Sequence, residues 1–199
     1  MRSGALVFLG AMGLWMGFPS VLAAEQQVQD GFSTDQILHS RYFTVYAESD
    51  INLEDLASRI SVPSGVLMIV KNPSFSARAG NLEDQLDGLF LAVSSIMNIQ
   101  LKKFHSEIKI CRDAPSLSRV AVNLFGRPVQ NRAFYVVALD TLYIDAEVVT
   151  LQVLGHEMSH AIQTHYFVVP PPEKIQEVLA GFVEYELRKY SNAPPSAGD

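Results

Sequence analysis

The chain has 199 residues, with 15 Lys and Arg against 21 Asp and Glu, which gives a formal net charge of −6. This length is typical of one domain, and the excess of hydrophobic residues (48%) over charged ones (18%) excludes an intrinsically disordered chain. The acidic balance, without any basic run, argues against a nucleic-acid partner. A single cysteine, Cys111, excludes both an intramolecular disulfide and a multi-cysteine metal site.

The first residues have the layout of a secretory signal. One arginine precedes the uncharged apolar stretch 5–18, Pro19 breaks that stretch, and small residues follow. We predict a signal peptide over 1–23, cut after Ala23 or alternatively Ala24, and export to the periplasm or the cell exterior. The other interpretation is an uncleaved membrane anchor, because the segment is nearly long enough to span a bilayer. Pro19 and the small-residue end favour cleavage, which would leave no stable membrane insertion.

The remaining sequence predicts one mixed α/β domain, of class α+β, over residues 24–190, with a disordered tail over 191–199. The polar, weakly patterned residues 25–40 predict a loose leader. Runs of β-branched, aromatic and apolar residues predict strands over 41–47, 66–70, 107–112, 133–138 and 141–144. Helical spacing of apolar residues predicts helices over 53–60, 82–99, 116–125, 146–165 and 173–190.

Capping residues predict where three of these helices begin or end. Asn81 and Asp145 are expected to cap the starts of the second and fourth helices, because their side chains can accept from free backbone N–H groups. Gly126 is expected to end the third helix, since glycine readily takes the left-handed conformation.

The sequence GHEMSH, within the fourth helix, contains an HExxH motif. Two histidines four residues apart, His156 and His160, lie on one face of a helix, so both imidazoles can bind one zinc ion. Glu157, beside the first histidine, can serve as the general base that takes a proton from an activated water. A catalytic zinc site needs a third protein ligand.

His165 is the nearest candidate for that ligand, and we reject it. The metzincin motif HExxHxxGxxH needs glycine at 163 and histidine at 166, where this chain has Gln163 and Tyr166. Without a glycine to turn the chain, His165 is rotated away from the HExxH face. We expect it to be an exposed histidine at the end of the helix.

The last helix carries EVLAGFVEYE, residues 177–186, and this sequence resembles the gluzincin metallopeptidases. The resemblance implies that Glu177, 17 residues after His160, is the third ligand of one zinc ion, and that Glu184 supports the site from two turns away. Small Ala180 and Gly181 are expected to let the two helices approach closely. The resemblance also implies a zincin-like fold with a small mixed sheet, whose edge strand before the HExxH helix pairs with an extended substrate.

Several positions depart from the gluzincin pattern. Gln176 stands where asparagine is usual, and Gly181 where thermolysin-like members carry an aspartate that orients the first histidine; Glu184 or a backbone carbonyl could replace it. The segment that captures a substrate amino terminus in aminopeptidases is absent, which favours an endopeptidase. Larger members take a group for the oxyanion from a downstream domain, whereas 22 residues follow Glu177 in this sequence, and the conceivable donors are Arg132, Tyr135, Tyr166, Tyr185 and Tyr190.

These features predict an exported zinc endopeptidase acting on a peptide or protein substrate, with oligomeric state undetermined. The alternative is a catalytically inactive zinc-binding module of the cell envelope with the same fold. A third possibility is that the HExxH motif is coincidental. Cys111 is expected to be a small buried hydrophobe, and the apolar positions of the HExxH helix to be core residues: Leu151, Leu154, Met158, Ala161 and Ile162.

Overall fold

The computed structural model describes residues 30–70 and 81–191, so the predicted signal peptide and residues 192–199 lie outside it. The chain forms an α+β fold, which confirms the predicted class. The strands are β1 (Gln36–His39), β2 (Phe43–Ala47), β3 (Ser106–Cys111), β4 (Ala133–Val136) and β5 (Thr141–Asp145). The helices are α1 (Leu53–Arg59), α2 (Ser64–Leu67), α3 (Leu82–Ile96), α4 (Ala114–Phe125), α5 (Leu151–Tyr166) and α6 (Glu173–Ser191), with a 3-10 turn at Val137–Leu139.

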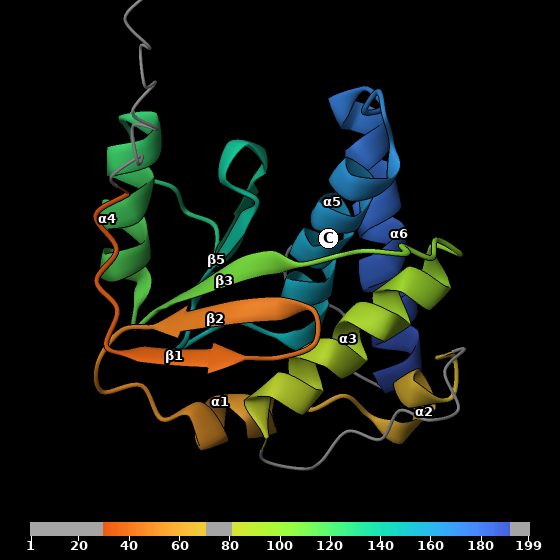
Figure 1. The fold of residues 1–199 in the computed structure, drawn as a ribbon, viewed down its shortest axis with the longest axis horizontal. Coiled ribbons are helices and arrows are strands. Elements are labelled where there is room, and N and C mark those ends of the chain that lie inside the picture. The colour runs from red at the N-terminus through yellow and green to blue at the C-terminus, as the bar shows by residue number, and fades with distance from the viewer. Residues whose placement is uncertain (1–29, 71–80, 192–199) are drawn as a thin grey trace, which may run out of the picture.

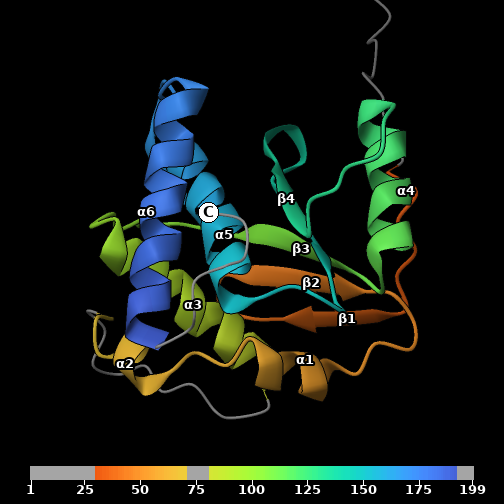
Figure 2. The ribbon, with the colours of Figure 1, turned by 180° about the vertical axis from the view of Figure 1, so that it is seen from behind.

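The strands form one mixed sheet in the order β1-β2-β3-β5-β4 (Figure 1). The three central strands run parallel, while β1 and β4 are antiparallel edge strands. The short connection between β4 and β5 makes them a hairpin, which explains their antiparallel pairing. The hairpin places β4 at the edge of the sheet that lies beside α5 (Figure 2).

Alternating side chains of the strands supply two hydrophobic cores, one on each face of the sheet. Ile110 of β3 and Ile144 of β5 point into the larger core, which α1, α3, α5 and α6 complete. Cys111 and Tyr143, their neighbours in sequence, point to the other face, where they pack against α4. Cys111 is fully buried, as expected, and burial raises the pKa of its thiol.

Two predictions in the first half of the chain are wrong. Residues 36–39 form β1 rather than a loose leader. Their backbone pairs antiparallel with β2, Gln36 opposite Ala47 and His39 opposite Thr44. Residues 66–70 do not form a strand: α2 ends at Leu67 and a turn follows. A short apolar run fits a helix or a strand equally well, and Pro63, with φ of −62°, directly precedes the first turn of α2.

The helix with the HExxH motif begins later than predicted. Asp145 is the last residue of β5 and not a helix cap; its Oδ1 accepts a hydrogen bond from the Glu147 N–H (2.9 Å) within the turn that follows. Thr150 caps α5 instead, and its Oγ1 accepts from the Val153 N–H at 3.3 Å. Asn81 and Gly126 act as predicted: Asn81 caps α3, and Gly126 follows α4 with a φ of 70°.

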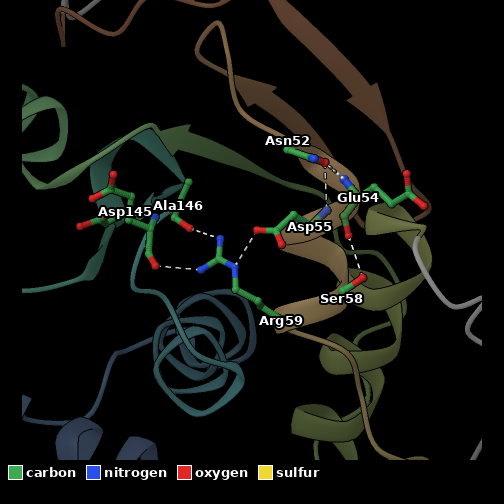
Figure 3. A network of polar contacts seen from close by, with 8 residues as sticks. Asn52, Glu54, Asp55, Ser58, Arg59, Asp145 and Ala146 are labelled. Carbon is green, nitrogen blue, oxygen red and sulfur yellow. Dashed lines mark hydrogen bonds and ion pairs between the residues drawn. The ribbon is translucent and has the colours of Figure 1, made fainter.

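The connection between β5 and α5 is held by one arginine from α1 (Figure 3). The Arg59 guanidinium donates to the backbone carbonyls of Ala146 and of Glu147, the latter at 2.9 Å, and its Nε donates to Asp55 at 3.1 Å. Charged donors to backbone carbonyls are among the stronger hydrogen bonds in proteins. Arg59 therefore ties α1 to the turn from which the HExxH helix starts.

We expect Arg59→Met to destabilise the fold by about 1–2 kcal/mol, since two carbonyls lose a charged donor at a partly exposed site. For a domain of this size the melting temperature should fall by roughly 2–8 °C, measured by circular dichroism. Asp55→Asn is the matched control, because it removes only the exposed ion pair within α1. An Arg59→Met protein as stable as this control would contradict the role of the arginine.

Candidate metal centre

The HExxH helix, α5, has one buried face and one face turned toward β4 and α6. The expected core residues are all buried: Leu151, Leu154, Met158, Ala161 and Ile162. With this face fixed against α3 and the sheet, His156 and His160 project from the other side of the helix, one turn apart. Their ring centroids lie 5.1 Å apart, and both side chains are mostly buried.

The last helix, α6, folds back on α5 after the loop 167–172 and packs through Ala180, Val183 and Leu187. The close approach of the two helices depends on Gly155 as well as on Ala180. A Cβ atom at Gly155 would lie 2.2 Å from Leu187 Cδ1, so a side chain there would force Leu187 to move. Gly181, by contrast, faces outward, and a Cβ atom there would meet nothing within 4 Å, which corrects its expected role at the helix interface.

This packing brings together the three residues that the sequence predicts as zinc ligands. Glu177 Oε2 lies 3.4 Å from His156 Nε2, and Glu177 Oε1 lies 3.4 Å from His160 Nε2. One potential ligand atom from each residue lies within 4.8 Å of the other two. The hairpin of α5 and α6 thus brings Glu177 next to His160, although the two residues are 17 positions apart in the sequence.

The geometry and chemistry of this cluster suit zinc. Ligands about 2.0–2.1 Å from a tetrahedral ion lie about 3.3 Å from one another, close to the 3.4 Å separations between Glu177 and each imidazole. Two imidazoles and one glutamate are also a frequent ligand set of catalytic zinc. Burial, with a smaller contribution from His156, lowers the pKa of His160 and favours the neutral imidazole that a metal requires.

Glu157 lies beside the cluster, against the edge of the sheet. Its Oε2 accepts a hydrogen bond from the Tyr135 backbone N–H of β4 at 3.1 Å. Burial raises the pKa of Glu157 to about 8, with the charge of Glu177 adding to the effect and the Tyr135 hydrogen bond opposing it. A nearby divalent cation would favour the carboxylate form.

Without a metal, the fold should lose stability as the pH rises. A carboxyl group whose folded pKa is about 8, against 4.5 when unfolded, is protonated in the folded state over that interval, so deprotonation opposes folding. We expect Glu157→Gln to match wild type near pH 4.5 and to be more stable by a few kcal/mol at pH 8. Urea unfolding with a chelator present measures this. A constant difference across the interval would contradict it.

Glu184 lies on the far side of His156 from Glu177. Its Oε2 is 3.5 Å from His156 Nδ1, and its Oε1 accepts a hydrogen bond from Arg188 at 2.7 Å. A carboxylate on the second ring nitrogen orients a ligating histidine and makes it more basic. The structure thus places the Glu184 carboxylate beside the candidate ligand His156, and Arg188, which the sequence did not single out, donates to that carboxylate.

A pocket of about 300 Å³ opens beside the cluster, and its lining combines apolar and amide side chains. The residues that line it are Asn131, Phe134, Tyr135, Val137, His156, Glu157, His160, Gln176 and Glu177. Among the five conceivable oxyanion donors only Tyr135 lines it, and the Tyr135 hydroxyl donates to Asp140 at 2.8 Å. Asn131 and Gln176 are the amide-bearing residues of this lining, and the Gln176 amide donates to the Pro171 carbonyl at 2.8 Å.

His165 lies apart from the cluster. Its Nε2 is 2.9 Å from Asp140 Oδ2, and its ring packs edge-on against Phe104.

Two groups near the cluster carry no sequence signal. The Tyr135 N–H belongs to the backbone, and Gln163, which donates to the Gln176 carbonyl at 3.4 Å, resembles any other polar residue of a helix.

The fold and the cluster define an α+β domain with an HExxH helix and a glutamate from the following helix at one site. A comparison with known protein families, with curated proteins and with solved structures found no match to this chain.

Proposed function

We propose that the protein is an exported zinc-dependent metallopeptidase that cleaves within peptide chains. The observation that carries this proposal is the convergence of His156, His160 and Glu177, with Glu157 adjacent to them at the edge of the sheet. The gluzincin-like sequence of α6 supports the same assignment of ligands.

Each residue of the candidate site would have its own role in peptide hydrolysis. His156, His160 and Glu177 would hold one zinc ion, which supplies a Lewis acid and lowers the pKa of water at the site. Glu157 would accept a proton from the attacking water and pass it to the leaving amine. The outer edge of β4 would align an extended substrate, and Glu184 with Arg188 would orient His156.

One observation favours the second candidate, an inactive zinc-binding module. The Tyr135 hydroxyl is engaged by Asp140, and the other four conceivable oxyanion donors do not line the pocket. A peptidase would then rely on the Asn131 amide to stabilise the oxyanion, because the Gln176 amide already donates to the Pro171 carbonyl at 2.8 Å. The two candidates share a metal site and differ in whether peptides are cleaved.

The proposal is tested by metal analysis and by cleavage of a broad peptide library. We expect about one zinc per chain in the purified protein, cleavage within peptides, loss of cleavage with a chelator and recovery on adding zinc. Bound zinc without cleavage would favour the inactive module. A protein that contains no zinc, and that a chelator does not destabilise, would contradict both candidates.

A further inference from the structure

A second pocket, of about 210 Å³, lies between α3, the start of β2 and the segment that follows α3. In both views the turn between β1 and β2 lies against α3 (Figures 1 and 2). Among the residues that the structure describes, none lines both this pocket and the one beside the metal cluster. We call it the α3 pocket and define it by Tyr42, Phe90, Leu91, Ser94 and Leu101.

The walls of the α3 pocket are largely apolar and include two aromatic rings. Phe90 is 4% exposed, and its ring centroid lies 4.3 Å from that of Tyr42 and 4.4 Å from that of Phe104. Leu91 and Leu101 add aliphatic side chains. Because neighbouring rings hold Phe90 in place, this wall is formed before any ligand binds, as is usual for binding sites of small molecules.

The polar groups of the α3 pocket are uncharged. Within the described part of the chain, no Asp, Glu, Lys, Arg or His side chain lines it, and its other polar residues are Ser94, Ser95 and Gln100. A charged ligand would lose its hydration here without gaining an ionic partner, whereas a neutral ligand would not. The lining therefore selects a neutral ligand.

Ser94 is the residue of this lining that the fold alone does not explain. It is 7% exposed, and its Oγ is one of two buried side-chain polar atoms without a hydrogen-bond partner within residues 30–70 and 81–191. A serine within a helix often bonds to the carbonyl one turn earlier, as Ser58 of α1 does to Glu54 at 2.9 Å. A buried hydroxyl without a partner destabilises the fold, and alanine is the better helix former.

The volume of the α3 pocket limits the size of its ligand. An engineered apolar cavity of about 150 Å³ holds one benzene molecule. At about 210 Å³, the α3 pocket has room for one such ring with small substituents. A flat ring can pack offset or edge-on against Phe90 and Tyr42, the arrangements that aromatic pairs prefer.

We propose that the α3 pocket binds a neutral molecule with one aromatic ring and one hydroxyl group, of the class of simple phenols. The ring packs against Phe90 and Leu91, and the hydroxyl pairs with Ser94 Oγ, which gives that buried group its missing partner. A free phenol and the tyrosine side chain of a peptide share this chemistry, and the experiment distinguishes these two sources.

Titrations with p-cresol, toluene and benzoate test the chemistry of the ligand. We expect p-cresol to bind wild type with a Kd of about 1 mM or tighter. Toluene, which lacks the hydroxyl, should bind about 10-fold more weakly, and so should charged benzoate. Calorimetry measures the affinities, and NMR chemical shifts of Phe90, Leu91 and Leu101 locate the bound molecule.

Ser94→Ala tests the role of the buried hydroxyl, because it should act in opposite directions on stability and on binding. Without ligand, the melting temperature should rise by about 2–4 °C, since a buried group without a partner is removed. The affinity for p-cresol should fall to that for toluene. Ser58→Ala is the matched control, a helical serine outside the pocket, and it should change neither affinity.

Leu91→Trp tests the location of the site independently of Ser94. Leu91 is partly exposed and lies one turn before Ser94 on the same face of α3, so a larger side chain there fills the pocket. We expect this variant to lose the binding of both p-cresol and toluene, and a thermal melt verifies its fold.

N-acetyltyrosinamide distinguishes the two sources of ligand. Binding at least as tight as that of p-cresol would assign the pocket to a tyrosine side chain of a peptide, and weaker binding would assign it to a free phenol. The proposal is overturned if Ser94→Ala binds p-cresol as wild type does, if its melting temperature falls, or if p-cresol shifts no signal of Phe90 or Leu91. None of these measurements depends on zinc content or peptide cleavage, so the proposed function stands or fails separately.

Discussion

Glu157→Gln is expected to abolish peptide cleavage while leaving the zinc content unchanged. The amide keeps the size of the side chain but cannot take up a proton, so the variant should lose roughly 10²–10⁴-fold in kcat. The three candidate ligands should stay in place, because the Glu157 carboxylate bonds to the Tyr135 N–H and the amide oxygen of glutamine can accept the same bond. Cleavage of a peptide found in the library screen, together with metal analysis, measures both effects.

Glu48→Gln is a useful control for this experiment, since it neutralises a buried carboxylate far from the metal cluster, where Glu48 accepts from the Arg112 N–H at 2.9 Å. It should keep both zinc and activity apart from any loss of stability. Wild type and Glu157→Gln proteins that cleave the same peptides at the same rate would show that Glu157 is not the general base. Cleavage at background level by both would point to the inactive zinc-binding module.

The second large effect is expected from Glu177→Ala, which should weaken zinc binding by more than about 100-fold. Substitution of a residue that only orients a ligand typically costs 10–100-fold, and Glu177 faces both imidazoles directly at 3.4 Å. Its carboxylate is about half exposed, so the alanine variant should still fold. Competition for zinc against a chromophoric chelator measures the affinity.

Glu184→Gln supplies the graded comparison for Glu177→Ala. It removes the charge 3.5 Å from His156 Nδ1 while the direct ligands remain, so we expect a loss of affinity of about 10–100-fold. If both variants lost the same zinc affinity, Glu177 could not be distinguished as a ligand from Glu184 as a residue that orients His156. Zinc affinity that is unchanged in Glu177→Ala would eliminate Glu177 as a ligand and, with it, the gluzincin-type assignment.

Much of the candidate site could be predicted because its parts obey local rules. The spacing of His156 and His160 places them on one helix face whatever surrounds the helix. Glu177 could be singled out without the fold, because the sequence around it resembles the gluzincins. The distances among these side chains were not predictable, since they depend on Leu187 packing against Gly155. Nor was the contact of Glu157 with the Tyr135 N–H, because a backbone group carries no sequence signal.

The errors in the predicted fold share a physical cause, which is that tertiary contacts outweighed weak local preferences. Residues 36–39 hold only two apolar residues, Ile37 and Leu38, within a largely polar segment, yet they form a strand because β2 offers a free edge. The apolar run 66–70 fits two periodicities, and α2 forms after Pro63. Asp145 is a good helix cap in isolation, but pairing of β5 with β3 extends the strand to this residue.

The sequence by itself determined the class of the fold, the helix that carries HExxH and the candidate ligands His156 and His160, because periodicity and spacing act over a few residues; Glu177 was singled out by the resemblance of the last helix to gluzincins. Only the tertiary structure decided how closely α6 approaches α5 and which carboxylate lies beside His156 Nδ1. Such arrangements join residues far apart in the chain, and the packing of helices on the sheet fixes them.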